Sequence, residues 1–137
     1  MNSRIIYQTN EGGVAIIVPA DCGLTIEEIA AKDVPAGKPY SIVDVADIPT
    51  DRTFRNAWEG DRITVNINKA KDIAHAARRA ARSVEFAPLD IKASIPSEAV
   101  AAEKARAVVR TKDDDMQAAI DAATTADAIK AAMPSRI

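Results

Sequence analysis

The side chains most often used for catalysis or metal binding are scarce in this sequence. His75 is the one histidine and Cys22 the one cysteine, and about fifty positions separate them. A metal site requires several ligands at workable spacing, and Cys–His catalysis requires an activated thiol beside a positioned base. The sequence meets neither requirement. It therefore predicts no metal, no cofactor and no catalytic residue, and it assigns no role to Cys22 or His75.

Carboxylates are abundant, but their positions indicate structural uses. The run "DDD" at 113–115 and Asp44, Asp47 and Asp51 are expected in turns or at helix starts, where Asp commonly caps the backbone. No glycine loop of the kind that binds phosphate and no calcium-binding loop is present. We therefore expect a protein that is not an enzyme.

A cluster of cations in the segment 69–82 is the strongest chemical pattern. Its members are predicted on the side of a helix that faces away from an apolar stripe, and they could contact phosphates. However, no aromatic residues interleave for base stacking, and the chain has a net charge of −2. A solvated face, or one that pairs with acidic segments, is preferred to a nucleic-acid-binding face. The cluster consists of Lys71, His75, Arg78, Arg79 and Arg82.

Charge is distributed unevenly along the chain. Residues 1–60 carry 9 acidic and 5 basic side chains, residues 61–112 carry 6 and 11, and residues 113–137 carry 5 and 2. Such asymmetry can mark an interaction surface. The simpler interpretation is that opposite blocks complement each other within the fold or between subunits.

The stretch "DIPTDRTFRNAW", 47–58, concentrates residue types that are rare elsewhere, including the one Trp. Asp51 can cap a turn, and Phe54 and Trp58 are then one helical turn apart. We predict that this aromatic pair is a structural clasp that holds the turn on a small β-sheet. The polar side chains off that face provide an alternative partner-binding edge: Arg52, Arg55 and Asn56.

The N-terminal half has the pattern of a small β-sheet with one helix. The runs 4–9 and 14–18 are β-rich, and the "NEGG" between them supplies the positive φ angles of a hairpin turn. Thr25 and Glu28 form a capping box for a helix at about 25–32. Two further strands are expected at 39–45 and 62–67.

From Asn68 the spacing of apolar residues becomes helical. A first helix is predicted to have Asn68 as its cap and to end near Pro88. Its apolar stripe consists of Ala70, Ile73, Ala74, Ala77, Ala81 and Val84. A second helix is expected after Pro96 and Ser97. The segment from Asp114 to Pro134 predicts one or two short helical pieces, the last capped at "TTAD".

The predicted fold class is α+β. A small antiparallel β head, residues 1–67, consists of a hairpin, two further strands and one short helix. An Ala-rich helical arm follows at 68–137, and its narrow apolar stripes suit association with a partner or a second copy. We expect no membrane span, because no run of 18 apolar residues occurs. The N-terminus has no secretory pattern, so a cytosolic location is the default.

Several motifs resemble small proteins encoded among the tail genes of tailed bacteriophages. The opening "IYQTNEGGVAIIVPA" and the later "DRTFRNAW" match one group of them. The segments "ARRAARSVEFAPLD", "AAEKARAVVRTKDD" and "AAIDAATTADAIKAAMP" look similar to phage tail and tail-fibre assembly chaperones. The resemblance implies a phage tail or fibre protein as the partner, and the host cytoplasm during assembly as the location.

Two other classes of function remain open at this stage. The chain could be a permanent structural component of the virion tail or fibre. It could also be a regulator directed at nucleic acid or at host defence, acting through the basic helix 69–82. The cation pattern does not favour nucleic acid as the partner, and we expect a homo-oligomer only through the Ala-rich helices.

Overall fold

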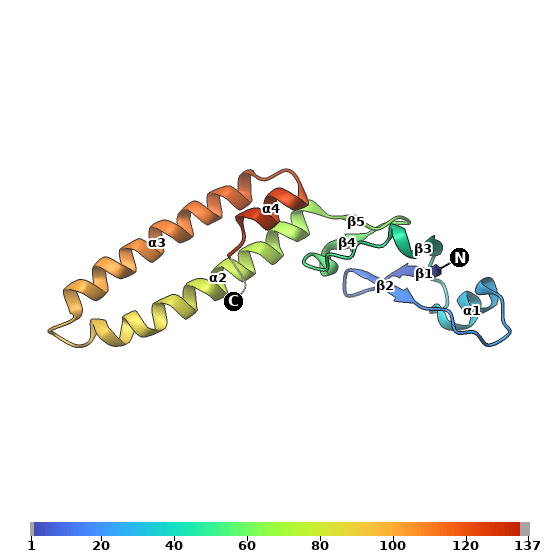
Figure 1. Cartoon of the computed structure of the whole chain (residues 1–137), viewed down its shortest axis with the longest axis horizontal. Helices are drawn as coiled ribbons and strands as arrows, with labels where there is room; N and C mark the ends of the chain where they lie inside the picture. The colour runs from blue at the N-terminus through green and yellow to red at the C-terminus, as the bar shows by residue number, and fades with distance from the viewer. Residues whose placement is uncertain (1, 135–137) are drawn as a thin grey trace. The chain divides into compact units, whose positions relative to one another are not determined.

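The computed structural model describes residues 2–134 and has the predicted α+β fold (Figure 1). The chain divides into two compact units, Met1–Lys69 and Ala70–Ile137, close to the boundary expected at 67/68. Among the described residues, the first unit holds every strand and one short α-helix. The second is helical.

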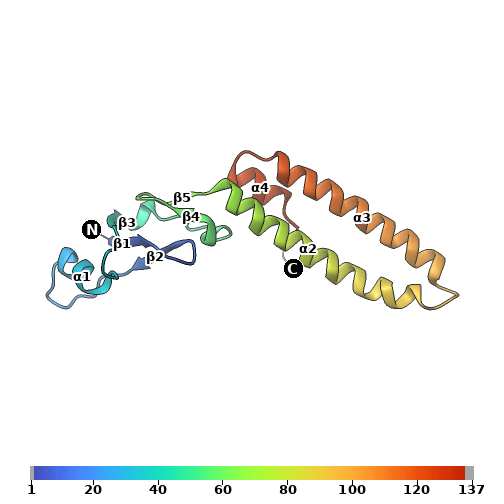
Figure 2. The same cartoon turned by 180° about the vertical axis from the view of Figure 1, so that it is seen from behind.

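A three-stranded antiparallel sheet forms the centre of the first unit. Its strand order is β2-β1-β3 (Figure 2). The register places Ile5 opposite both Ile17 and Ile42. Because side chains alternate along a strand, Ile5 and Ile6 lie on opposite faces. Both are fully buried, so the sheet has a small core on each side. The strands are β1 (Ser3–Gln8), β2 (Val14–Ile17) and β3 (Tyr40–Asp44).

Helix α1 (Ile26–Asp33) covers one face of the sheet. Ile29 and Ala30 pack with Ile5 there. The predicted capping box is confirmed, because the Thr25 hydroxyl accepts from the Glu28 N–H and the Glu28 carboxylate accepts from the Thr25 N–H. A strong local cap therefore stabilises a helix of only eight residues.

Trp58 is the main side chain on the other face, where it packs against Ile6 and Val14. Phe54 is also buried. The expected helical i,i+4 spacing of the pair is wrong, because a short 3-10 turn, η2 (Arg55–Ala57), precedes Trp58 and the backbone of Trp58 is extended. Trp58 thus enters β4 (Trp58–Glu59) instead of continuing a helix.

The fourth strand predicted at 62–67 is mostly wrong. Only β5 (Thr64–Val65) is a strand, and it pairs with β4 in a separate two-stranded ribbon. The alternation of apolar residues ends at Asn66, whose side-chain oxygen accepts from the Lys69 N–H, 3.0 Å away. This bond makes Asn66, rather than Asn68, the residue that caps the next helix.

Helix α2 (Ile67–Ala93) passes through Pro88, so the expected end at this proline is wrong. Proline has no N–H and leaves the carbonyl of the residue four positions earlier, Val84, without its helical donor. Val84 is 73% exposed, so water can bind that carbonyl. Phe86 and Leu89 remain half-buried on either side of Pro88, which favours continuation.

Helix α3 (Ala99–Ala122) is longer and more regular than the sequence pattern indicates. The acidic run 113–115 lies inside it, not in a turn or at a helix start as expected, because Asp113 is held by arginines of α2. The last helix, α4 (Ala126–Ala132), begins at Thr125, whose hydroxyl accepts from the Ala128 N–H as predicted for "TTAD".

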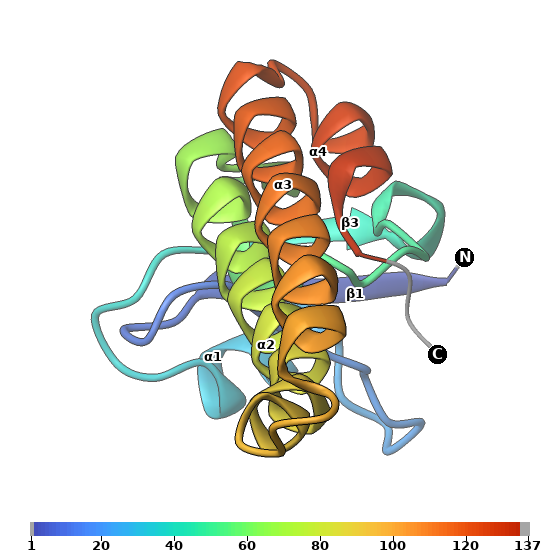
Figure 3. The same ribbon diagram turned by 90° about the vertical axis from the view of Figure 1, so that its left-hand side faces the viewer.

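α2 and α3 run antiparallel and side by side, with α4 near the C-terminal end of α3 (Figure 3). The less exposed positions of α3 repeat with heptad spacing, which is the pattern of a helix that faces one partner. They are Ala99, Ala102, Arg106, Val109, Asp113, Met116 and Ile120, continued by Ala123 just after the helix; Ala105 is the one further half-buried position of α3. The α2 and α3 backbones stay mostly more than 8 Å apart between Cα atoms, so side chains longer than alanine make most of the direct contacts between them.

The hairpin turn depends on two glycines at positive φ, as the sequence predicts. Gly13 has a φ of +83°, and a Cβ placed there would lie 3.2 Å from the carbonyl oxygen of Arg55. The turn between β1 and β2 thus packs directly on the backbone of η2. This contact holds the segment 47–58 against the hairpin.

We expect Gly13→Ala to destabilise the first unit more than Gly37→Ala does. Gly37 has a φ of +82°, but a methyl group added there would meet open space, so its substitution adds only backbone strain, about 1–2 kcal/mol. Gly13→Ala adds a clash with a backbone oxygen, about 1 kcal/mol more. Urea unfolding followed by the fluorescence of buried Trp58 measures both. Equal losses would show that the close approach has no energetic effect.

Candidate partner-binding site

The predicted edge in the first unit lies on the surface. Arg52, Arg55 and Asn56 are exposed, and among residues 2–134 their side chains make no hydrogen bond or ion pair. Asp51 orders the turn beside them, since its carboxylate accepts from both the N–H and the hydroxyl of Thr53. Phe54 and Trp58 are buried, and Trp58 packs on the sheet.

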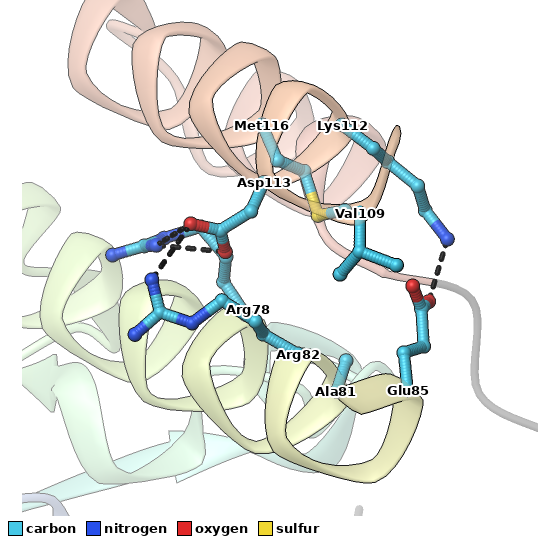
Figure 4. Close-up of a pocket in the computed structure, with 8 residues that line it drawn as sticks. All are labelled: Arg78, Ala81, Arg82, Glu85, Val109, Lys112, Asp113 and Met116. Carbon is cyan, nitrogen blue, oxygen red and sulfur yellow. Dashed lines mark hydrogen bonds and ion pairs between the residues drawn. The ribbon is translucent and has the colours of Figure 1, made fainter. Parts of the chain in front are cut away.

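The basic cluster of α2 has a different arrangement from the one predicted. Arg78 is not on the outer side of the helix but buried, in line with Ala70 and Ala74. Its Nη1 donates to both carboxylate oxygens of Asp113 on α3, at 2.9 and 2.8 Å (Figure 4). Both side chains are about 95% buried. A charge with a partner at this distance can be buried at tolerable cost, whereas an unpaired charge cannot.

Three further side chains extend this ion pair into a chain of contacts. Arg82 donates to the same Asp113 carboxylate at 3.0 Å. On the other side, Arg78 Nε donates to His75 Nδ1 at 3.2 Å. The other ring nitrogen of His75, Nε2, lies 2.8 Å from a carboxylate oxygen of Asp121.

Lys71 and Arg79 complete the predicted cluster, with opposite outcomes. Lys71 donates to the backbone carbonyl of Asp121 at 2.8 Å. Arg79 is exposed and makes no hydrogen bond or ion pair with the described part of the chain. Of the four predicted partner-binding cations on α2, Arg79 is therefore the one without an intrachain contact, whereas Lys71, Arg78 and Arg82 bind α3.

In the half of the two helices nearer their loop, the charges are reversed: the acidic side chains are on α2 and the basic ones on α3. Glu85 of α2 accepts from Lys112, and Asp90 of α2 pairs with Arg106. Glu103 on α3 accepts from Arg106 and Arg110. The hydrogen bond from Arg110 holds the pKa of Glu103 below its ordinary value. Along α2, the side chains that contact α3 thus change from basic to acidic. Over the same distance, the side chains of α3 that face them change from acidic to basic.

This pattern selects one alignment of the helices. In the antiparallel arrangement, cations of α2 face the acidic half of α3, and Glu85 and Asp90 face its basic half. A parallel arrangement would bring like charges together, which is unfavourable. The charge blocks read from the sequence therefore complement each other within the second unit. The sequence pattern places Asp113 in a turn or at a helix start and does not single out Glu103. The contrast between the basic block 61–112 and the acidic block 113–137 pointed only to pairings such as Arg78 with Asp113.

The pocket in Figure 4 lies against the buried ion pair and is too small for a substrate. Its volume is about 10 Å³, room for roughly one water molecule. A second, open hollow of about 510 Å³ lies between α2 and α3. It is lined by Arg82, Ser83, Phe86, Ala87, Asp90, Arg106 and Arg110.

Within residues 2–134, no group of three or more His, Cys, Asp or Glu side chains could hold a metal ion. Cys22 is exposed. No described helix is both long and apolar enough to cross a bilayer. Comparison with protein-family models, with curated proteins and with solved structures finds no match to this chain.

We expect Asp113→Leu to destabilise the helical unit by about 3–5 kcal/mol, because it leaves Arg78 buried without its carboxylate. Arg78→Met should cost less, since Arg82 still pairs with Asp113. The double variant Arg78→Met/Asp113→Leu should recover much of the loss, because no unpaired charge of this pair remains buried. Urea unfolding followed by far-UV circular dichroism provides the measurement.

Asp114→Leu is the matched control, because Asp114 is exposed on the adjacent position of α3. It should change the free energy of unfolding by less than about 0.5 kcal/mol. If the losses of the two single variants simply added in the double variant, the coupling between Arg78 and Asp113 would be refuted.

Proposed function

We propose that this chain is a non-enzymatic phage tail-region protein that acts through protein–protein contacts, as a chaperone-like factor in the assembly of the tail or its fibres. The phage assignment rests on the resemblance of its sequence motifs. The protein-binding role rests on the surface of the helical unit.

The observation that carries the protein-binding role is the poor burial of apolar side chains in the half of the α2–α3 hairpin nearest its loop. Within residues 81–112, Ala102 alone is buried. Large apolar side chains there are exposed: Val84, Ile91, Ile95, Val100 and Val108. Isolated hydrophobic side chains are common on surfaces, but clusters mark interaction sites.

Two of these exposed side chains, Val84 and Ile91, belong to a regular apolar stripe on α2. Ala76, Ala80, Val84, Ala87 and Ile91 follow one another at intervals of three or four residues, and all are exposed. This spacing places them on one face of a helix. The face is about a third of a turn from the one that meets α3, so α2 has a wider apolar surface than one neighbouring helix covers. A helix of a partner protein, or of a second copy, would complete this packing.

The arrangement of cations does not support a nucleic-acid-binding regulator. Binding to nucleic acid requires cations that are free to neutralise phosphates. On α2, Lys71, Arg78 and Arg82 are engaged with α3, and acidic Glu85 and Asp90 interrupt the positive track. The same hairpin is better suited to a protein surface that combines apolar and charged groups.

We expect Val84→Asp/Ile91→Asp to abolish capture of the partner by the full-length chain without unfolding it. Both side chains are about 70% exposed, so their replacement removes apolar contact area with little effect on the chain itself. Binding to tail and fibre proteins of the encoding phage would be measured by affinity capture, and folding by circular dichroism. Ala101→Asp/Thr111→Asp on exposed positions of α3 adds the same charge. Equal loss in that control would contradict a role for the α2 stripe.

Deleting the gene from its phage separates an assembly factor from a virion component. A chaperone should be found bound to a fibre or tail protein in infected lysates and be missing from purified particles. Its deletion should yield particles that lack the corresponding fibre or tail part. A stoichiometric amount of the chain in purified particles would instead establish the structural alternative. Normal particles without the gene would overturn both roles.

A further inference from the structure

The open hollow between α2 and α3 brings three guanidinium groups together. Arg82 comes from α2, and Arg106 and Arg110 come from α3. Asp90 is the one carboxylate in the lining, so the lining has a positive balance. Phe86 and Ala87 supply an apolar part of the wall. A hollow of about 510 Å³ accommodates a few side chains rather than a single ion.

The three arginines retain donors that no described residue uses. Each guanidinium has five N–H groups. Arg82 uses Nη1 on Asp113, and Arg110 uses Nη2 on Glu103. Arg106 contacts Asp90 and Glu103, but its Nε is buried and has no hydrogen-bond partner. The Arg106 Nε is out of contact with solvent, so the donors open to an outside acceptor are the unused N–H groups of Arg82 and Arg110, whose side chains are 41% and 49% exposed.

We propose that this hollow binds an acidic peptide segment of the partner protein, whose carboxylates accept from Arg82 and Arg110 and whose neighbouring apolar side chain lies against Phe86. Guanidinium groups bind carboxylates through pairs of parallel hydrogen bonds. This inference rests on the proposed function for its biological partner. Ala87 belongs to both the hollow and the α2 stripe, but the arginines that the test replaces lie outside the stripe.

The surroundings of the hollow favour a peptide over a nucleic acid. A nucleic acid would require a continuous track of cations and stacked aromatic rings. Here Glu103 already binds two of the arginines, Asp114 is exposed one turn beyond Arg110, and Phe86 is the one aromatic residue of the lining. One or two carboxylates on a short segment match the positive charge that Asp90 and Glu103 leave uncompensated.

Fluorescence anisotropy with the full-length chain tests the proposal. The probe is a fluorescein-labelled peptide of sequence Glu-Leu-Glu-Glu-Leu-Glu, and the control probe has Gln in place of each Glu. We expect the acidic probe to bind and the Gln probe to bind at least about tenfold more weakly, a difference of about 1.4 kcal/mol. Arg110→Gln should weaken binding of the acidic probe about tenfold. Arg110→Lys should retain part of it, because the charge remains and the paired donors do not.

Lys104→Gln is the matched variant. Lys104 is exposed on the same helix, outside the hollow, and its substitution removes the same charge. It should change the affinity less than about twofold. Equal weakening by Lys104→Gln and Arg110→Gln, or no binding of the acidic probe, would overturn the proposal. Tighter binding of a labelled octathymidylate that is also lost in Arg110→Gln would overturn it in favour of a phosphate ligand. Neither outcome affects the Val84→Asp/Ile91→Asp test of the proposed function.

Discussion

The buried ion pair between Arg78 and Asp113 is the constraint on which the helical unit depends. Two opposite charges lie almost out of contact with water, and each is costly to bury without the other. The pair therefore permits one alignment of α2 and α3. A slip by one heptad would place Arg78 opposite Arg106 or Ile120 of the α3 seam, where no carboxylate compensates its charge.

Alanine explains why such a constraint is needed. An Ala-rich seam has little shape to distinguish one register from the next and buries little area per residue. Large apolar knobs set the register of most paired helices. Here Val109, Met116 and Ile120 are the larger apolar residues of the α3 seam, and Asp113 lies among them. A polar pair within a weak apolar seam lowers stability but excludes alternatives. The contacts of Glu85 and Asp90 with α3 extend the same selection along the helices.

Sequence reasoning succeeded where local rules decide the structure. The hairpin turn needs glycine at positive φ, and the Thr25 capping box needs residues three apart, so both could be predicted from short segments. Predictions failed where distant residues decide. Pro88 lies within α2 because Phe86 and Leu89 on either side of it are half-buried in the helical conformation. No rule based on neighbouring residue types predicts that burial. The acidic run 113–115 is typical of a turn, yet it is helical because Asp113 meets an arginine 35 positions away.

The same limit applies to the candidate sites. Residue type alone placed Arg78 and Arg82 on a binding face, whereas tertiary pairing draws them inward and leaves Arg79 outside. Helical periodicity predicted a buried Val84 because it continues the line of Ala74, Ala77 and Ala81. The structure shows that α3 covers only part of this apolar arc. A period of 3.6 residues identifies an apolar face but not the width that a neighbour covers.

The division of the hairpin into two halves follows from these interactions. At the end near α4, Ile120 and Ile129 are fully buried, and Ala70 and Ala74 have no exposure. Toward the loop, ion pairs on the surface replace apolar burial, and such pairs contribute little stability in water. Local stability should therefore decline toward the loop. These charge pairs keep the two helices aligned without filling the space between them. Apolar side chains and arginine donors therefore stay accessible, as the proposed binding of a protein partner requires.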